Sequence, residues 1–528
     1  MKIEARKFSS KWMFTGIFIL GLLIRIYGLN SESLSFDEIY SLKLAGLTLP
    51  EIINETAKDY HPPLYYTLLH FWIILFGTSE ISVRLLSSLL GAAAIPVIFL
   101  LGRLIYSERA GLYAAFLMSV SNINIVHSQE ARMYTLLSLL AMLSFYFLQQ
   151  ILRRADFRSY LFFILFNTAM IYTHFYSFFI AAAEILFLIL AALYGRNNEW
   201  RSLLKPAGAV VLSLLMYLPW LPVFLKQYRT AHSFLWIPEA TAWQIPETVT
   251  EFAGSGLLLI ILLPLSALAF LQPVISGKRL NVSEQPGLFF FLRKTELTGN
   301  IYLLLWLTVP VLLPFLVSVL MQPIFLVKYT IASSGAFLLL CARGLNELKW
   351  KWGSLILIIF IAAFSFDNVL HLHTFPRSDR WKEAVAYIDA NAGSSDIALF
   401  NSASCIDLFK YYSLRKDLAS AGYNPDWKKA STDSIMSDIK PYIKNYSTVY
   451  LVLSHSVYQE KVLRAFESLS EKKDSVFFYS FQRRYFFLTY YSSSSYDIYL
   501  KKMYASPDIM LYKFSKKTAD GKVASINQ

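Results

Sequence analysis

Two adjacent carboxylates, Asp37 and Glu38, follow the first long apolar run of the 528-residue chain. A carboxylate within hydrogen-bond reach of an acceptor hydroxyl can remove its proton as a general base. A third acid, Asp59, lies further along the same polar stretch. The competing explanation is that these acids are only solvated loop residues. Asp37 and Glu38 are therefore candidate catalytic residues, and both explanations stay open at this point.

A histidine and two prolines, His61-Pro62-Pro63, stand where the chain re-enters an apolar region. Proline restricts the backbone and fits the first helical position, where no amide partner is needed. The N-terminus of a helix that starts here would favour an anion such as phosphate. His61 can bind a proton, a phosphate or, together with Asp59, a divalent metal, although this spacing defines no metal site. A purely structural histidine is the alternative.

A third cluster of ionisable residues, His127-Ser-Gln-Glu130-Ala-Arg132-Met-Tyr134, separates two apolar runs. Charged groups at a membrane boundary are candidates for function. The alternative is a structural ion pair between Glu130 and Arg132. The sequence alone is consistent with both a functional site and a structural ion pair.

Single basic or titratable residues stand near the ends of other apolar runs, at Arg84, His174 and Lys328. Each alone is explained equally well by a side chain that snorkels to the membrane surface. Together they predict a basic pocket beside the acidic pair, which suits a phosphate-linked donor. The predicted phosphate-binding residues are Arg84, Arg132, Lys328 and His61, and the further site candidates are Asp59, Glu130 and His174.

The elements that must position these residues are membrane helices. The chain is 55% hydrophobic and 16% charged, whereas soluble domains are about a quarter charged. Runs long enough to cross about 30 Å of hydrocarbon cover residues 12–29, 85–106, 110–127, 134–151, 159–176, 178–194, 207–225, 254–271, 301–321, 326–342 and 353–370.

Basic residues are concentrated in alternate connections between these runs, which predicts that those connections are cytoplasmic. A further run at 62–77 is borderline, and a full crossing there would place every later basic cluster outside. We therefore predict that 62–77 lies in the outer interface or is partly re-entrant. The clusters also account for most of the net charge of +13, so we exclude nucleic acid as a partner.

These patterns predict an α-helical polytopic membrane protein of about 11 transmembrane helices with a C-terminal extracytoplasmic α/β domain. It would lie in the cell (plasma) membrane with its N-terminus in the cytoplasm. A helix over 381–389 and strands over 396–400, 447–453 and 475–481 indicate the α/β domain, which we expect to position an acceptor and to supply no catalytic group. The predicted boundaries are a membrane domain at 1–370 with a first outer loop at 30–83, the α/β domain at 371–514 and a disordered tail at 515–528.

The order of these motifs resembles the protein O-mannosyltransferases and their bacterial relatives, the aminoarabinose and lipopolysaccharide-sugar transferases. The resemblance rests on Asp37-Glu38 after the first helix, Asp59-x-His61-Pro-Pro-Leu and the run that begins at Arg84. The segments Ser128–Tyr134, Tyr172–His174 and Gln322–Tyr329 are similar to the bacterial subgroup. The match covers roughly residues 10–350.

This resemblance implies the fold of the C superfamily of glycosyltransferases and a polyprenyl- or dolichyl-phosphate sugar as donor. It maps the acid of the first loop onto Asp37 and two phosphate-side positions onto Arg84 and Arg132. The chain departs from the family at Lys328, where relatives often carry Arg, and at Tyr65-Tyr66, where mannosyltransferases have Gly-Lys. The second departure counts against a strict protein O-mannosyltransferase.

The expected activity is therefore a hexosyl- or pentosyltransferase reaction at the extracytoplasmic face. The partners implied are the lipid-phosphate sugar, the bilayer, and a glycan, lipid or protein acceptor. No cofactor is certain, and a divalent metal is a possibility with Asp59 and His61 as candidate ligands. The chain has no Asp-x-Asp motif for a nucleotide donor, which agrees with a lipid-linked one. A non-catalytic polysaccharide or lipid transporter, or flippase, is the alternative.

Overall fold

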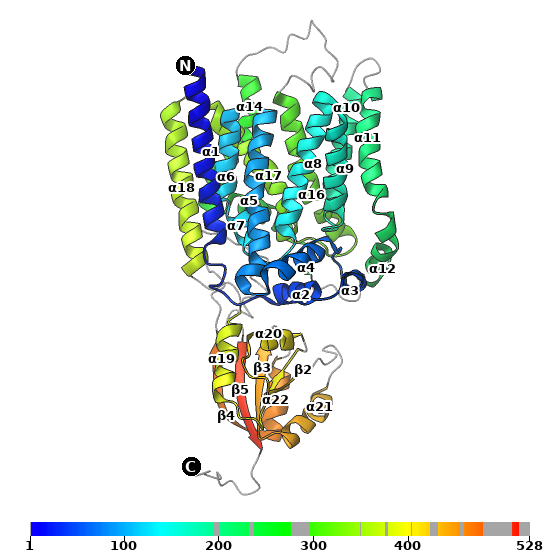
Figure 1. Cartoon of the computed structure of the whole chain (residues 1–528), viewed down its shortest axis with the longest axis vertical. Helices are drawn as coiled ribbons and strands as arrows, with labels where there is room; N and C mark the ends of the chain where they lie inside the picture. Colours follow the sequence, from blue (N-terminus) through cyan, green and yellow to red (C-terminus); the bar gives the residue numbers. More distant parts are fainter. Residues whose placement is uncertain are drawn as a thin grey trace. The chain divides into compact units, whose positions relative to one another are not determined.

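The chain folds into two units, which are described separately (Figure 1). The computed structural model describes residues 2–194, 200–231, 237–275, 296–348, 350–374, 379–402, 404–422, 431–454, 459–478 and 509–516. The membrane unit contains the described residues up to Leu29 and Leu44–Leu372. The C-terminal unit contains Asn30–Lys43 and the described residues from His373 onward. This grouping differs from the predicted boundaries, because residues 30–43 go with the C-terminal unit.

The membrane unit is a bundle of helices, and each predicted apolar run coincides with helical structure in it. Among the described residues, five helices are long and apolar enough to cross a membrane, or up to seven if each bent pair is one span. The chain is thus a multi-pass membrane protein, while the number of eleven spans stays a prediction. The helices are α1 (Lys2–Ile26), α3 (Leu49–Thr56), α4 (Leu64–Phe76), α5 (Glu80–Ile105), α6 (Glu108–Val120), α7 (Asn122–Ser128), α8 (Tyr134–Arg154), α9 (Phe157–Ile171), α10 (Ser177–Tyr194), α11 (Trp200–Leu215), η1 (Leu218–Trp220), α12 (Leu221–Ala231), α13 (Gln244–Ala253), α14 (Gly256–Ile275), α16 (Glu296–Leu320), η2 (Val327–Ser333), α17 (Ser334–Glu347) and α18 (Lys351–Thr374).

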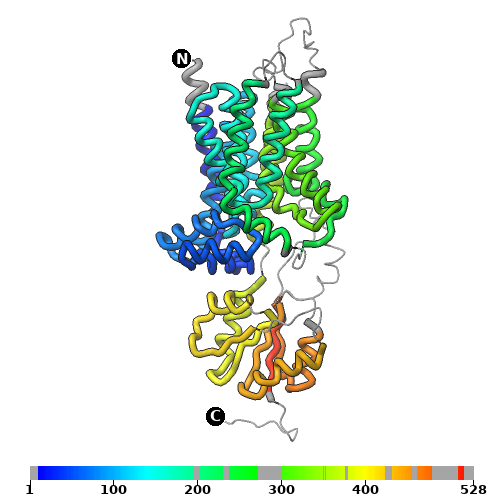
Figure 2. The backbone as a smooth tube through the Cα atoms, turned by 90° about the vertical axis from the view of Figure 1, so that its right-hand side faces the viewer, coloured from blue at the N-terminus to red at the C-terminus, as the bar shows by residue number. Residues whose placement is uncertain are grey.

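The borderline run at 62–77 forms α4, which has 13 residues. A helix of this length extends only about 20 Å, less than the roughly 30 Å of a hydrocarbon core. Both ribbon views show α3 and α4 lying across one end of the bundle, whereas the long helices run along it (Figures 1 and 2). This arrangement agrees with an interfacial helix.

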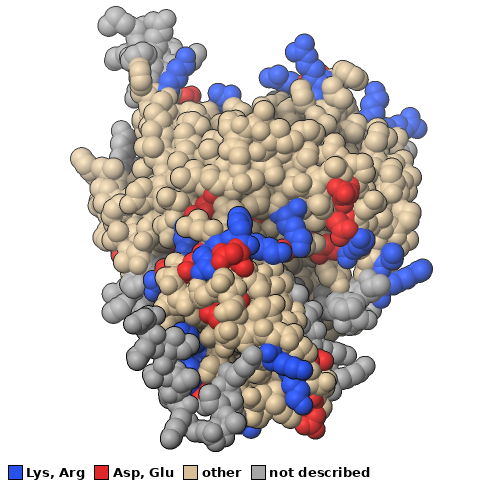
Figure 3. All heavy atoms as spheres, turned by 60° about the horizontal axis from the view of Figure 1, so that its bottom comes forward, with Lys and Arg blue, Asp and Glu red and all other residues tan. Residues whose placement is uncertain are grey.

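The surface of the molecule also has the charge distribution of a membrane protein. In the face drawn in Figure 3, Lys and Arg side chains project at the upper edge, and a broad belt without charged residues separates them from mixed charges lower in the view. Such a belt is what the apolar interior of a bilayer requires, because buried charge is costly there.

The run at 110–127 is not one straight helix, which corrects the prediction. Helices α6 and α7 meet at 55°, and Ser121 between them has extended backbone. The guanidinium of Arg25 in α1 is fully buried and donates to the carbonyls of Met118 and Ser119, at 2.8 and 3.1 Å. A buried cation at the last carbonyls of a helix stabilises its end, so Arg25 explains how α6 can stop inside the bundle.

Two further runs are also broken. The run at 207–225 is interrupted after Leu215 by the short 3-10 helix η1, which contains Pro219. Proline has no amide hydrogen and disrupts a continuous helix. The run at 326–342 starts with the 3-10 helix η2, and its α-helix begins only at Ser334. This second break places Lys328 on a tight 3-10 turn.

The C-terminal unit contains a five-stranded sheet of order β2-β1-β3-β5-β4. Strands β2, β1 and β3 are parallel, and β5 pairs antiparallel with both β3 and β4. The fold class predicted for this part, a small α/β domain, is confirmed. Its elements are the start of α2 (Phe36–Ala45), α19 (Trp381–Asn391), β1 (Ile397–Phe400), α20 (Cys405–Tyr412), β2 (Ala419–Gly422), α21 (Thr432–Asn445), β3 (Thr448–Ser454), α22 (Gln459–Leu469), β4 (Ser470–Phe478) and β5 (Ile509–Lys516).

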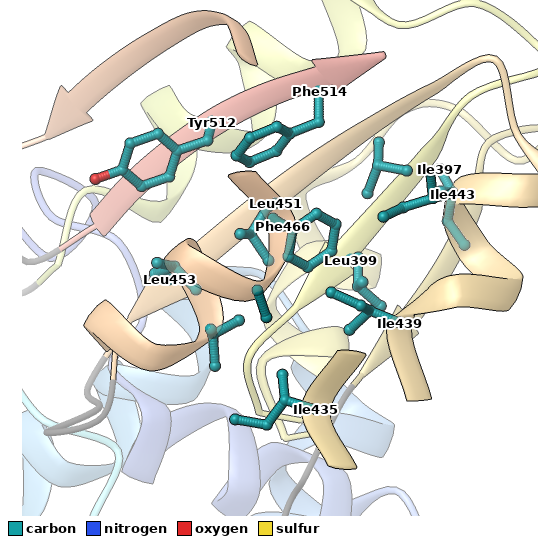
Figure 4. Packing of buried hydrophobic residues seen from close by; sticks show 13 residues of the cluster. Ile397, Leu399, Ile435, Ile439, Ile443, Leu451, Leu453, Phe466, Tyr512 and Phe514 are labelled. Carbon is teal, nitrogen blue, oxygen red and sulfur yellow. The ribbon is translucent and has the colours of Figure 1, made fainter. Parts of the chain in front are cut away.

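Apolar side chains cover both faces of the inner strand β1. On one face Ile397 and Leu399 pack with α21 and α22 in the core shown in Figure 4. On the other face the ring of Phe400 lies 6.1 Å from that of Trp381 in α19. The helix and three strands predicted from sequence are present, β2 was not predicted, and β5 runs to Lys516, beyond the expected end at 514. Residues 517–528, the rest of the predicted tail, lie outside the described residues.

Candidate functional site

Basic and aromatic side chains from four separate segments meet in the membrane unit. We call His61, Arg132, Tyr134, His174, Lys328 and Tyr329 the basic–aromatic cluster. The imidazole rings of His61 and His174 lie 5.0 Å apart between centroids, and the ring of Tyr329 lies 4.7 Å from that of His174. The ring of Tyr134 lies 6.1 Å from that of Tyr329. The cluster therefore brings together four residues that the sequence predicts separately: His61, Arg132, His174 and Lys328.

The loops that carry the cluster are joined by hydrogen bonds to backbone carbonyls. The Leu64 amide, at the start of α4, donates to the Tyr172 carbonyl at 3.2 Å. The Tyr176 hydroxyl donates to the Ile324 carbonyl at 3.1 Å, which links the α9–α10 loop to the stretch before η2. The paired prolines fix the chain just before α4. These bonds hold His61, His174 and Lys328 on a common framework.

Both histidines of the cluster are buried and neutral. Burial, and then the positive charges of Arg132 and Lys328, lower the pKa of His174 to about 3. The pKa of His61 is lowered well below its usual value by burial and by the nearby His174, Arg132 and Lys328. At neutral pH these rings therefore act as hydrogen-bonding groups and not as cations.

The tautomer of His174 is set by its surroundings. The Tyr176 amide donates to Nδ1 at 3.1 Å, so the hydrogen of the neutral ring is on Nε2. Neither Nε2 of His174 nor Nδ1 of His61 has a hydrogen-bond partner among the described residues. A buried polar group without a partner costs free energy. Binding a ligand acceptor at the Nε2–H group of His174 would remove that cost.

The cluster carries its positive charge on Arg132 and Lys328. The side chain of Arg132 is almost fully buried, and its Nη1 donates to the hydroxyl of Tyr66 at 3.5 Å. The ammonium of Lys328 lies 5.5 Å from the ring centre of Tyr134 and 5.9 Å from that of Tyr329. Cation–π contacts of this kind stabilise an ammonium group at the edge of an apolar region. Two cations in such surroundings favour an anionic ligand.

The remaining predicted residues of the membrane unit make contacts outside the cluster. Arg84 in α5 donates to the Leu29 carbonyl at 2.8 Å and so ties α5 to the end of α1. Glu130 pairs with Nδ1 of His127 at 2.9 Å. The backbone carbonyl of Asp59 accepts from the side chain of Gln227. Their predicted roles stay predictions.

The two adjacent carboxylates differ in their structural role. Asp37 and Glu38 lie in the first turn of α2, within the C-terminal unit. Glu38 accepts from the Ser35 amide at 2.8 Å, and Ser35 accepts from the Glu38 amide at 3.3 Å. This reciprocal pair is a capping box, which stabilises the start of a helix. The side chain of Glu38 therefore has a structural function, whereas Asp37 is partly exposed.

Three tyrosines in or beside the cluster were not predicted as site residues. Tyr66 contacts Arg132, and Tyr134 and Tyr329 surround Lys328. All three lie inside motifs that the sequence singles out for their charged members. The sequence feature that could have identified them is a tyrosine within or next to each basic motif. This feature is weak evidence, because tyrosine is also common at the ends of membrane helices.

A metal site stays an open prediction. Among the described residues, no group of three or more His, Cys, Asp or Glu side chains is arranged to hold a metal ion. Asp59 and His61 alone would leave most of the coordination to a ligand or water.

We predict that the stability of the protein falls in mild acid because of His174. Its native pKa of about 3 is below the ordinary 6.5, so the unfolded chain binds the proton first as the pH falls. The contribution to unfolding free energy is complete above pH 6.5 and is lost toward pH 3, by up to about 1.4 kcal/mol per pH unit. Thermal unfolding of detergent-solubilised protein at neutral pH and near pH 5 measures this loss.

His174→Gln should reduce the difference in unfolding temperature between the two pH values. His70→Gln, at a partly exposed histidine, should leave that difference unchanged. An equal difference in all three proteins would contradict the prediction.

Part of the sequence and the overall fold are similar to those of known membrane glycosyltransferases. Residues 60–222 match the family of dolichyl-phosphate-mannose-protein mannosyltransferases. The matched stretch includes His61, Arg132 and His174. Solved structures of glycosyltransferases of the C superfamily share the fold. The resemblance predicted from the sequence is therefore confirmed. No curated protein sequence matches the chain.

Three of these structures are similar over most of the chain. ArnT from Cupriavidus metallidurans has a TM-score of 0.56 at 13% identity, covering 86% of this chain and 94% of that one. The same protein bound to undecaprenyl phosphate has a TM-score of 0.55 at 14% identity, covering 84% and 94%. The archaeal oligosaccharyltransferase AglB from Archaeoglobus fulgidus, in complex with an inhibitory peptide and a dolichol-phosphate, has a TM-score of 0.50 at 12% identity, covering 88% and 73%. At these identities the likeness shows the fold.

Proposed function

We propose that the chain is a membrane glycosyltransferase that moves a sugar from a polyprenyl-phosphate or dolichyl-phosphate donor to an acceptor hydroxyl. The observation that carries this proposal is the basic–aromatic cluster, in which Arg132 and Lys328 lie in one region with two buried histidines. The bound lipid phosphates of the structural relatives support it.

The reaction needs two kinds of help from the protein. A bond forms between the acceptor oxygen and the anomeric carbon, and the bond from that carbon to the phosphate oxygen breaks. The electron pair of the broken bond leaves with the lipid phosphate, where negative charge grows. Fixed cations stabilise that charge. The proton of the acceptor hydroxyl passes to a carboxylate acting as general base.

We assign these roles as follows. Arg132 and Lys328 offset the charge on the leaving phosphate, and His174 donates a hydrogen bond from Nε2. His61 and Arg84 complete the phosphate side, and Asp37 accepts the proton from a glycan, lipid or protein acceptor. The proposed orientation puts the C-terminal unit outside the cell and the N-terminus in the cytoplasm.

The test is transfer by purified protein. Undecaprenyl-phosphate sugars of several kinds, labelled in the sugar, are incubated with the protein and membrane extract as acceptor source. We expect label to leave the lipid and undecaprenyl phosphate to accumulate with at least one donor. A protein that moved the intact lipid across vesicle membranes and released no undecaprenyl phosphate would be a flippase, and the proposal would be wrong.

A further inference from the structure

We propose that helices α19 and α20 hold residues 30–43, here called the Asp37 segment, and thereby position Asp37 for transfer. This inference rests on the proposed role of Asp37 as base. It assigns positioning residues more than 300 positions away in the sequence, chiefly Lys382 and Tyr412. All the contacts that carry it lie within the C-terminal unit.

The first contact caps a helix with a residue of the Asp37 segment. The first amides of a helix have no partner inside it and are usually capped by the residue just before the helix. Arg380 stands at that position in α19 and forms no side-chain cap. The hydroxyl of Ser33 accepts from the Lys382 amide at 3.0 Å instead. The Asp37 segment thus supplies the cap that the sequence around α19 lacks.

The second contact satisfies a buried amide of the Asp37 segment. Leu34 is fully buried, and its backbone amide donates to the hydroxyl of Tyr412 at 2.6 Å. Leaving such a buried amide without a partner is unfavourable, so the bond to Tyr412 stabilises this conformation. Tyr412 is the last residue of α20, so this bond fixes Leu34 to a rigid element.

Two further contacts hold the ends of the Asp37 segment. The ammonium of Lys382 donates to the carbonyls of Asn30 and Glu32, at 2.8 and 3.4 Å. At the other end, Lys43 pairs with Asp407 of α20 at 2.8 Å. This last pair is exposed, and exposed pairs contribute little stability. The main restraint therefore comes from the bonds at residues 30–34.

The contacts at residues 30–34 determine the backbone position of Asp37 through the start of α2. Ser35 directly follows the fixed Leu34, and its capping box with Glu38 sets where the helix begins. Asp37 is the second residue of that helix, so its backbone position follows from that of Leu34. A base misplaced by about 1 Å can lose roughly a hundredfold in rate. Removing the hydrogen bond of Ser33 or of Leu34 should therefore slow transfer and leave the proposed donor-binding residues unchanged.

The test uses Tyr412→Phe and Ser33→Ala in the full chain, with undecaprenyl-phosphate sugar as donor. We expect each to lower kcat between about tenfold and a hundredfold, with unchanged binding of undecaprenyl phosphate. Tyr442→Phe in α21, which also loses one tyrosine hydroxyl in the same unit, should transfer normally. Amide hydrogen exchange should be faster in peptides that cover residues 30–43 in both variants and unchanged in the control.

The Asp37→Asn background separates positioning from a general structural effect. If Tyr412 acts through Asp37, then Tyr412→Phe should cause little further loss once Asp37 is replaced. Normal kcat in Tyr412→Phe, or unchanged exchange over 30–43, would overturn the inference and leave the proposed function intact. Full activity of Asp37→Asn itself would instead overturn the proposed role of Asp37.

Discussion

Asp37→Asn is expected to lower the rate of sugar transfer by about 10²–10⁴-fold, the range of general-base catalysis. The amide is similar in size but cannot accept the acceptor proton. Asp37 is partly exposed in the first turn of α2, so its replacement should not disturb folding. The rate of undecaprenyl phosphate release, measured at saturating donor, gives the effect on kcat.

Glu38→Gln is the matched control for this prediction. Glutamine serves as well as glutamate in a capping box, so the start of α2 should be preserved, and we expect transfer within a few-fold of the unaltered protein. An equal loss in Glu38→Gln and Asp37→Asn would mean that both carboxylates take part in the reaction. Near-normal transfer by Asp37→Asn would move the role of base to another acid, such as Asp59.

Removing either cation of the basic–aromatic cluster is expected to lower kcat/KM by about 10²–10³-fold, as for other groups that stabilise charge in a transition state. The variants are Arg132→Met and Lys328→Met, which keep an unbranched apolar side chain and lose the charge. Both should also weaken binding of undecaprenyl phosphate. The two losses should not add, because both cations act on one phosphate.

Lys328→Arg should retain most activity, because it keeps the positive charge. Lys58→Met is the matched control, since its ammonium is exposed and pairs with Glu55 at 2.6 Å. Normal transfer by Lys328→Met would contradict the assignment of Lys328 to the donor phosphate.

Much of the membrane fold follows from the apolar runs, because length and hydropathy are what a bilayer selects. The breaks within these runs do not follow from length and hydropathy. Ser121 lies inside a run that is apolar on both sides, and the break there depends on Arg25, almost a hundred residues earlier. Long-range hydrogen bonds of this kind have no local pattern. The short strand β2 was missed for a similar reason, since Ala419–Gly422 is defined by its pairing with β1.

The candidate site could be predicted in part, because its charged residues stand out against an apolar sequence. His61, Arg132, His174 and Lys328 lie in one cluster, and their predicted roles stay predictions. The neutrality of the two histidines could not be predicted, since it depends on burial and on neighbouring charge. The contact between residues 30–43 and α19 could not be predicted either, because the cap of that helix comes from Ser33, which is remote in the sequence.

The most direct test of the central claim is a structure of the protein determined with undecaprenyl phosphate bound. The account predicts the phosphate oxygens within salt-bridge distance, about 4 Å, of both Arg132 and Lys328, with Nε2 of His174 as a further donor. A phosphate bound elsewhere, with Arg132 and Lys328 keeping the tyrosine contacts described above, would contradict it.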